Sequence, residues 1–389
     1  MDCNPLIRFM RFGRSMSDRR PLEILMTTRA PGDGGAERVW ATIARGLAAR
    51  GDRVTLAVDR AGRGFAATDA DVAVEVIGEH FGAGILHLAR LLRHGRPQIA
   101  LAATSGSCSK LAIAALLARS GTPLVLSYHG FEEYKTGKLA AAAYWGMPVL
   151  NRLSSRIVAV SDALKDELVG RWGAAPAKTR RIYNPVEMDF AGAAAGAGDL
   201  ATRRPAILAV GRLSREKGMD DLVRAFARVA RPDAHLTLLG DGPDRAALTA
   251  LIGELGLGGR VEIVGWHEDP TAYYRAARLV VVPSRTEAFG MVVVEALAHG
   301  LPIVSTTCGG PAEILAGGRF GQLVGIGDVA AMAAAIETAL DRPGDPAERI
   351  RRAEAFSAEI GIAGWSALID EVVAERAERA ARRLAAARG

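Results

Sequence analysis

The chain has 389 residues, enough for two domains of ordinary size, and 49% of them are hydrophobic while only 5% are aromatic. Its net charge is +6, but the basic residues are spread along the chain without interleaved aromatic residues, so we expect no nucleic-acid partner. No apolar run approaches the ~20 residues that a membrane-spanning helix needs.

The cysteines and the N-terminus indicate where the protein works. Cys3, Cys108 and Cys308 lie far apart and lack metal-ligand spacing, which favours a reducing, cytoplasmic compartment. The basic first residues contain no apolar stretch of the kind found in signal peptides. We interpret residues 1–20 as a disordered basic leader, with Met16 as an alternative start.

Strand and helix patterns alternate over residues 21–186, which is typical of a parallel sheet with crossover helices. The first predicted strand, residues 22–28, leads through a glycine-rich loop into a helix that ends at Gly51. The remaining elements of this half are strands at 53–59, 72–78, 98–104, 124–130 and 156–162, and helices at 85–94, 109–119 and 138–153. Residues 181–186 end this half, which therefore has six or seven strands.

Residues 187–204 are rich in small residues and are interpreted as a flexible linker. A second alternating series occupies residues 205–356, and residues 357–389 form a helical segment. The sequence therefore predicts an α/β protein with two Rossmann-like, doubly wound domains and a cleft between them, the usual place for a small-molecule site. The predicted strands of the second series are 206–212, 235–241, 261–266, 279–284 and 302–307.

A strand-to-helix turn in the second domain carries two carboxylates, Glu287 and Glu295. The backbone N–H groups of Phe289, Gly290 and Met291 open the helix, and helix N-termini suit anions and polar oxygens. Glu295 lies two turns further on, within reach of a second part of an elongated ligand such as a ribose. An ordinary βα junction explains the same spacing, so the residues alone leave both interpretations open.

A basic loop, GRLSREKG, follows the first strand of the second domain and contains Arg212 and Lys217. Two cations five residues apart on one loop suit a diphosphate, because Arg forks onto two oxygens while Lys acts as a point charge. A solvated basic loop is the alternative. The neighbouring strand ends in GDGP, whose Gly240 begins a turn that could lie beneath a nucleotide base.

Two features of the first domain are candidates for the opposite wall of the cleft. Gly34 and Gly35 open a helix and could cradle a phosphate, although the loop matches neither the dinucleotide fingerprint nor a P-loop. His129 ends a predicted strand and could hydrogen-bond a phosphate or a sugar hydroxyl, although a lone His is more often structural. The acidic pair in Asp69–Asp71 lies in a turn before a strand, so we expect no metal site there.

Taken together, these motifs resemble the retaining glycosyltransferases of family 4, which have the GT-B fold. The matching segments occur in the order of the family and cover nearly the whole chain. They are GGAERV at 34–39, VSDALKDEL at 160–168, NPV at 184–186, GRLSREKG at 211–218, GDGP at 240–243, GW at 265–266, EAFGMVVVE at 287–295 and GGPAEIL at 309–315.

The resemblance implies transfer of a hexose or N-acetylhexosamine from a nucleotide sugar to a hydroxyl, with retained configuration and without a divalent metal or other cofactor. Carried over by motif, Arg212 and Lys217 would hold the donor diphosphate in place of a metal ion. Glu287 would bind hydroxyls of the donor sugar together with the backbone of residues 289–291. Glu295 would bind the nucleotide ribose.

The same resemblance gives Gly211 and Gly240 places in the donor site. Gly34 and Gly35 would approach the β-phosphate when the cleft closes, and His129 would lie beside the donor sugar. The fold of the family also implies that the C-terminal helix returns to the N-terminal domain. No residue is an evident covalent nucleophile, so a front-face mechanism is expected.

A UDP-linked donor is favoured, with GDP-mannose as the nearest variant. The expected acceptor is a lipid-linked or polysaccharide hydroxyl, and the basic N-terminal half could contact an anionic membrane peripherally on its cytoplasmic face. Two other classes stay open: a nucleotide-sugar epimerase, and a non-catalytic nucleotide-sugar-binding protein.

Overall fold

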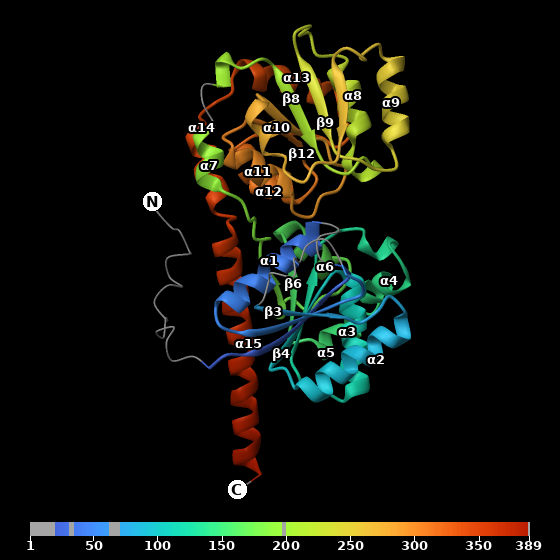
Figure 1. Ribbon diagram of the computed structural model, residues 1–389, viewed down its shortest axis with the longest axis vertical. Coiled ribbons are helices and arrows are strands. Elements are labelled where there is room, and N and C mark those ends of the chain that lie inside the picture. The colour runs from blue at the N-terminus through green and yellow to red at the C-terminus, as the bar shows by residue number, and fades with distance from the viewer. Residues whose placement is uncertain (1–19, 31–34, 62–70, 197–199, 388–389) are drawn as a thin grey trace.

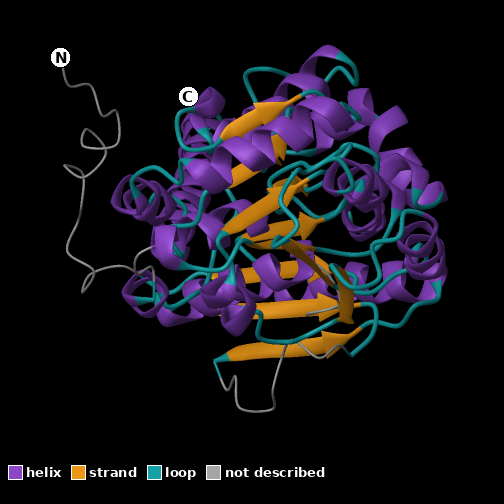
Figure 2. Cartoon of the chain, turned by 90° about the horizontal axis from the view of Figure 1, so that it is seen from above, coloured by secondary structure: helices purple, strands orange, loops and turns teal. Residues whose placement is uncertain are grey.

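The computed structural model describes residues 20–30, 35–61, 71–196 and 200–387, which form two α/β domains stacked along the long axis of the molecule (Figure 1). Each domain is built on an all-parallel sheet with helices on both faces (Figure 2). The N-terminal sheet has the order β3-β2-β1-β4-β5-β6-β7. Its strands are β1 (Glu23–Thr28), β2 (Arg53–Val58), β3 (Val72–Val76), β4 (Ile99–Ala103), β5 (Leu124–Tyr128), β6 (Arg156–Ala159) and β7 (Thr179–Arg181).

The C-terminal sheet has the order β10-β9-β8-β11-β12-β13. In both sheets the strand order reverses beside the first strand, and such switch points favour ligand binding at the carboxyl ends of the strands. The strands are β8 (Ala206–Val210), β9 (His235–Leu239), β10 (Val261–Gly265), β11 (Leu279–Val282), β12 (Ile303–Thr306) and β13 (Gln322–Val324). The prediction of two doubly wound domains is confirmed.

Helices connect successive strands in both halves. Those of the N-terminal half are α1 (Gly35–Ala49), α2 (Phe81–Arg90), α3 (Ser105–Ala118), α4 (Lys138–Trp145), α5 (Met147–Leu153) and α6 (Asp162–Gly170), with short turns η3 (Leu91–Gly95) and η4 (Glu133–Lys135). Helix α7 (Phe190–Ala195) and the turn η5 (Leu200–Thr202) lead from β7 to β8, and α7 packs against helices of the C-terminal domain. Those of the C-terminal half are α8 (Met219–Phe226), α9 (Arg245–Glu254), α10 (Thr271–Ala276), α11 (Met291–Ala298), α12 (Gly310–Ile314), α13 (Val329–Asp341), α14 (Pro346–Glu354) and α15 (Ala358–Ala386), with turns η6 (Arg215–Lys217) and η7 (Ala316–Gly318).

The central strands β1, β4 and β5 are buried on both faces because helices cover both, whereas the edge strand β3 is largely exposed. In β1, Ile24 and Met26 pack into a cluster with α1 and α15, whereas Leu25 packs into the cluster on the side of α2 and α3. This alternation follows from the period of two along a strand. Burial on both faces explains why the strand sequences read as continuous apolar runs.

The structure differs from the predicted elements in several places. The helix predicted at 85–94 begins earlier, at Phe81, and its last turn is η3. The helix predicted at 138–153 is divided at Gly146, just before Pro148, into α4 and α5. Helix α3 begins earlier, at Ser105. Strand β13 was not predicted, because it is only three residues long and begins with a polar Gln. The linker, expected to be flexible, contains α7, whose N-terminus is capped by the Asp189 carboxylate.

The chain crosses between the domains twice, and the two crossings lie side by side. Val186 donates to the Phe356 carbonyl at 3.0 Å, and Ala358 donates to the Val186 carbonyl at 3.0 Å. The second crossing leads into α15, which returns along the N-terminal domain as the resemblance implied (Figure 1). Neither α15 nor any other helix among the described residues has the length and apolar character needed to cross a membrane.

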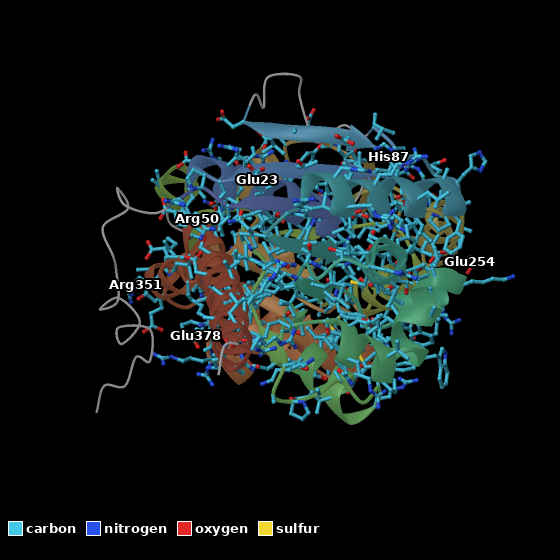
Figure 3. The ribbon with its side chains drawn as sticks, turned by 90° about the horizontal axis from the view of Figure 1, so that it is seen from below. Glu23, Arg50, His87, Glu254, Arg351 and Glu378 are labelled. Atoms are coloured by element: carbon cyan, nitrogen blue, oxygen red, sulfur yellow. The ribbon has the colours of Figure 1, made fainter. Side chains whose placement is uncertain are left out.

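Helix α15 completes the N-terminal core instead of forming a separate unit. Trp365 meets Trp40 of α1 edge to face, with ring centroids 5.2 Å apart. Arg50, labelled in Figure 3, contacts Asp370 of α15 at 3.4 Å at the rim of the same interface. Buried residues of α15 recur at helical spacing, which explains why this face adheres to α1. They are Gly361, Trp365, Leu368, Ile369 and Val372.

A further contact joins the domains beside the crossings. Glu313 of α12 accepts hydrogen bonds from the backbone N–H of Asp162 at 2.8 Å and from the Tyr183 hydroxyl at 2.5 Å. A carboxylate of one domain therefore occupies the N-terminus of helix α6 in the other, where the helix dipole favours negative charge. Ser161 caps α6 from within its own domain by accepting from Leu164.

Candidate functional site

A cleft of about 1130 Å³ lies between the domains, where the strands of both sheets end. From the N-terminal domain it is lined by the start of α1 and the segment after β5. From the C-terminal domain it is lined by the segments after β8, β9, β10 and β11. The cleft brings together most of the predicted site residues: Gly35, His129, Gly211, Arg212, Lys217, Gly240, Glu287, Met291 and Glu295.

Lys217 and Glu287 form an ion pair in the wall of this cleft, with the Nζ atom donating to Oε2. Lys217 ends the turn η6, and its position is fixed by Gly218, whose φ of 63° lies in the left-handed region. A Cβ on Gly218 would lie 2.2 Å from the Pro283 carbonyl oxygen, so only glycine fits there. The backbone of Glu287 is fixed by a hydrogen bond of 3.0 Å, which its carbonyl accepts from the N–H of Gly310 at the start of α12.

Arg212 lies on the same loop as Lys217 and projects into the cleft with an exposed side chain. It forms no ion pair with any residue that the structure describes, so its guanidinium is available to a ligand. Beneath it, the ends of β8 and β9 approach backbone to backbone. A Cβ on Gly240 would lie 1.9 Å from the Gly211 carbonyl oxygen, which explains the glycine at 240 by packing as well as by ligand access.

Glu295 extends from α11 and is half-buried in the cleft wall. Its Oε2 atom accepts a hydrogen bond of 2.5 Å from the hydroxyl of Tyr274. Burial raises the pKa of Glu295, although the Tyr274 hydroxyl and the charge of Arg38 oppose this rise. Because Arg38 belongs to α1, a cation of the N-terminal domain lies close enough to act across the cleft.

The residues between Glu287 and Glu295 that were predicted to bind the donor sugar are only partly in the cleft. Phe289 is buried against Tyr183 and Phe356, with ring centroids 5.9 Å from each. Gly290 is the N-cap of α11 with a φ of 102° and is also buried, and neither residue is among those that line the cleft. Met291 does line the cleft and packs against the core of the N-terminal domain as well.

His129 follows β5 and faces the cleft from the N-terminal domain. Its Nε2 atom lies 3.0 Å from the Ser127 hydroxyl, and its ring meets Trp40 edge to face at 6.2 Å. Burial lowers the pKa of His129 to about 4, so the imidazole is neutral near pH 7. Its Nδ1 atom is buried without a hydrogen-bond partner among the described residues. Such an orphaned atom in a cleft suits a ligand hydroxyl.

Glu133 also lines the N-terminal wall and was not predicted. One carboxylate oxygen accepts from the backbone N–H of Ser105 at 2.7 Å, and the other accepts from the N–H of His129 at 3.2 Å. Burial raises the pKa of Glu133 to about 7 despite these bonds. In the sequence it is one of two acidic residues in a polar turn, and only its tertiary partners distinguish it from its neighbour Glu132.

The glycine loop and the acidic turn of the N-terminal domain are only partly described. Gly34 and the first part of the Asp69–Asp71 turn lie outside the described residues. Gly35 is the first residue of α1 and lines the cleft, with open space where a Cβ would point. Within the described ranges, no group of three or more His, Cys, Asp or Glu side chains is arranged to hold a metal ion.

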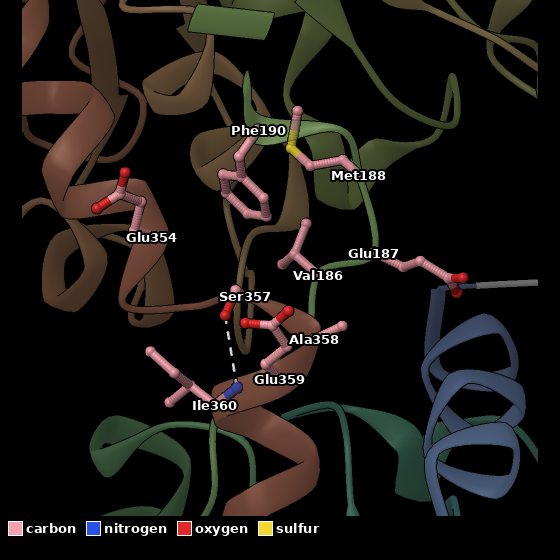
Figure 4. Close-up of a pocket in the computed structure, with 9 residues that line it drawn as sticks. All are labelled: Val186, Glu187, Met188, Phe190, Glu354, Ser357, Ala358, Glu359 and Ile360. Atoms are coloured by element: carbon pink, nitrogen blue, oxygen red, sulfur yellow. Dashed lines mark hydrogen bonds between the residues drawn. The ribbon is translucent and has the colours of Figure 1, made fainter. Parts of the chain in front are cut away.

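A smaller cavity of about 480 Å³ lies at the interdomain crossings (Figure 4). Its lining contains three carboxylates, Glu187, Glu354 and Glu359, and no Lys or Arg. It therefore cannot neutralise an anionic ligand. The cations, the orphaned imidazole and the ends of both sheets all belong to the larger cleft, which we take as the site.

Two family models match the chain, one in each domain. The model described as Glycosyltransferase Family 4 matches residues 33–190, and the model described as Glycosyl transferases group 1 matches residues 204–342. The segments matched correspond to the two walls of the cleft.

Relatives in sequence have consistent descriptions. D-inositol 3-phosphate glycosyltransferase 1 of Catenulispora acidiphila is 34% identical over 291 residues, which are 67% of this chain and 68% of that protein. The lipopolysaccharide core biosynthesis glycosyltransferase LpsE of Rhizobium meliloti is 38% identical over 139 residues, which are 36% of this chain and 40% of that protein.

Among solved structures, HepE of Anabaena in complex with UDP superimposes with a TM-score of 0.76 at 23% identity, covering 90% of this chain and all of that one. At this identity the likeness shows the fold. Both family models match, and the chain aligns with two thirds of the length of a relative that is 34% identical. The chain therefore belongs to glycosyltransferase family 4 and has the GT-B fold.

Proposed function

We propose that this protein is a retaining hexosyltransferase that moves a hexose or N-acetylhexosamine from a nucleotide sugar to a hydroxyl of a lipid-linked or polysaccharide acceptor. The observation that carries the proposal is the Lys217–Glu287 ion pair in the interdomain cleft, beside the guanidinium of Arg212, which has no ion-pair partner among the described residues. Two cations and a carboxylate at one strand edge match a ligand that has both phosphates and sugar hydroxyls.

The donor is proposed to be UDP-linked, with GDP-mannose as the nearest variant. The structures of HepE from Anabaena contain UDP and UDP-glucose, and this chain shares their fold. Arg212 and Lys217 would bind the diphosphate, which frees Glu287 for hydroxyls of the donor sugar. Glu295 would bind the ribose. No divalent metal is needed in this proposal, because the two cations neutralise the charge that develops on the leaving diphosphate.

The proposed chemistry is a front-face displacement. The bond between the anomeric carbon and the donor phosphate breaks, and the acceptor oxygen bonds to that carbon on the same face. The acceptor proton passes to the departing phosphate oxygen. His129 is neutral near pH 7, which suits a hydrogen-bonding role beside the sugar rather than a second positive charge.

Two further classes remain as alternatives, and each has a distinct signature. An epimerase would convert the nucleotide sugar without any acceptor, and a binding protein would hold it without turnover. Release of free nucleoside diphosphate that depends on an added acceptor would exclude both.

The deciding experiment is a thermal-shift screen of UDP, GDP and ADP, each with Mg²⁺ and with a chelator, followed by the matching sugar conjugates. A ligand that binds only the folded state adds roughly 2.7 kcal/mol at a hundredfold excess over its dissociation constant. We expect UDP to raise the melting temperature equally with and without Mg²⁺. If no diphosphate has any effect, the cation pair is not a diphosphate site and the proposal fails.

A further inference from the structure

Exposed side chains recur along α4 and α5. Helix α4 lies at the edge of the N-terminal domain away from α15 (Figure 1). The hydrogen bonds from Gly146 to the Ala142 carbonyl and from Leu150 to the Gly146 carbonyl continue the helical pattern through the junction. Exposed side chains therefore stay on one face, at intervals of three and four residues. We define the ridge by Lys138, Ala142, Trp145, Val149 and Arg152.

The centre of the ridge is unusually apolar for a surface. Trp145 is 75% exposed although Trp172 flanks it edge-on at 5.3 Å, and Val149 is 54% exposed. A single exposed hydrophobic side chain is normal on a protein surface, but a cluster of them is typical of an interaction site.

Helix α3 extends the apolar area. It follows the strand next to the one that α4 follows, and Ser109 donates to the Leu139 carbonyl at 2.8 Å, so the two helices run side by side in the same direction. About 10 Å further along this direction, each helix ends in exposed apolar residues. On α3 these are Leu116 and Leu117, at 55% and 53% exposure.

Positive charge surrounds this apolar centre. Residues 81–180 contain 13 Lys and Arg but only 5 Asp and Glu. Two of these cations, Lys110 and Arg156, are buried and paired with carboxylates outside this range, so they do not contribute to the ridge. Lys138 and Arg152 are exposed at the two ends of the ridge, and residues 135–153 contain no acidic side chain. At the end of α3, Arg93 donates to the Leu117 carbonyl at 3.3 Å.

An exposed Trp with flanking cations matches the boundary of an anionic bilayer. The indole ring prefers the headgroup level, and each Lys or Arg near the surface is attracted by anionic lipid. A second copy of the chain fits less well, since a two-fold contact would place the basic ends of the ridge against one another.

The ridge also lies next to the cleft. Lys135 and Thr136 line the cleft, and α4 begins at Lys138 and reaches Trp145 about 10 Å further on. We propose that the α4–α5 ridge docks on an anionic lipid bilayer and holds the N-terminal wall of the cleft at the level of a lipid-anchored acceptor. The lipid-anchored acceptor rests on the function proposed above, whereas the docking surface rests on the ridge itself.

The test is co-sedimentation of the full chain with vesicles of phosphatidylglycerol and phosphatidylcholine in equal parts, and with pure phosphatidylcholine. We expect binding to the anionic vesicles only, weakened by salt. The double variant Lys138→Gln/Arg152→Gln should bind roughly 10- to 30-fold more weakly. The variant Trp145→Ser/Val149→Ser should lose about tenfold or more.

Matched controls come from the C-terminal domain, where Ile326 is 49% exposed and Arg351 is exposed (Figure 3). Ile326→Ser and Arg351→Gln should sediment with the vesicles as the unaltered chain does. Equal binding to both lipid mixtures, or no loss in the ridge variants, would overturn the proposal. So would attachment to native membranes that disappears after protease treatment of those membranes, because the partner would then be a protein.

The nucleotide thermal shift separates this inference from the proposed function. A UDP shift without vesicle binding rejects the docking surface and leaves the transferase proposal standing. Vesicle binding without any nucleotide shift supports the docking surface and rejects the transferase proposal. All ridge variants should keep the UDP shift of the unaltered chain, which also shows that they are folded.

Discussion

The two walls of the cleft differ in how they hold their functional groups. On the C-terminal wall, Lys217 and Glu287 pair with one another and Glu295 is bonded to Tyr274, so charged groups are fixed before any ligand arrives. On the N-terminal wall, burial leaves His129 neutral near pH 7 and raises the pKa of Glu133 to about 7. The difference suits a charged diphosphate on the C-terminal wall and the uncharged hydroxyl groups of the sugar and the acceptor on the N-terminal wall.

The largest expected effect comes from removing Lys217 from the C-terminal wall, which we call the charged wall. We expect Lys217→Ala to lower turnover by about 10²–10³-fold or more, because a preorganised charge at the leaving group is lost. The urea unfolding curve should stay near that of the unaltered protein, since Lys217 is half-buried on a surface turn.

The control for this variant is Arg215→Ala, which removes an exposed cation two residues away in the same turn. It should keep nearly full activity. Near-normal turnover of Lys217→Ala would show that the charged wall does not bind the leaving group.

A second test concerns the packing beneath the charged wall. Gly240→Ala would place a Cβ 1.9 Å from the Gly211 carbonyl oxygen at a residue with a φ of 149°. We expect about 2–4 kcal/mol lower stability in urea unfolding, from steric overlap and backbone strain. In contrast, Gly253→Ala on α9 meets no atom within 4 Å and should raise stability by about 0.5–1 kcal/mol. Equal stability of the two variants would contradict the close approach of β8 and β9.

The smallest expected effect concerns His129 on the N-terminal wall and is a dependence of folding stability on pH. The pKa of His129 falls from 6.5 to about 4 on burial, so the unfolded chain binds more protons than the folded one between these values. Stability is therefore fully present above pH 6.5 and is lost as the pH falls toward 4, by about 1–3 kcal/mol.

His129→Gln should remove this loss when urea unfolding is compared at several pH values. Glu133 has the opposite tendency, because its raised pKa makes the folded chain less stable as the pH rises from 4.5 to about 7. Glu133 is present in both proteins, so the difference between them isolates His129. The control is His235→Gln, which changes an exposed residue of β9. This variant should still lose stability as the pH falls. If His129→Gln lost as much stability at low pH as the unaltered protein, His129 would not be buried as a neutral group.

Local sequence was sufficient for the architecture, because strand and helix periods are local. It was also sufficient to place Lys217, Glu287 and Glu295 in one cleft, since each lies at a fixed distance from a strand end. It was not sufficient for groups whose role depends on distant partners. Nothing local distinguishes Glu133 from Glu132, and Glu313 gives no sign that it caps a helix of the other domain.

Helix α15 has a consequence for the order in which the protein can fold during synthesis. A ribosome releases every strand of the C-terminal sheet before it releases Trp365 and the other side chains that α15 adds to the N-terminal core. The domain that is made first can therefore finish its core only last, and until then the side of Trp40 that α15 covers stays open. A fragment that stops at residue 186 would keep this exposed patch permanently, and it should aggregate more readily than the full chain.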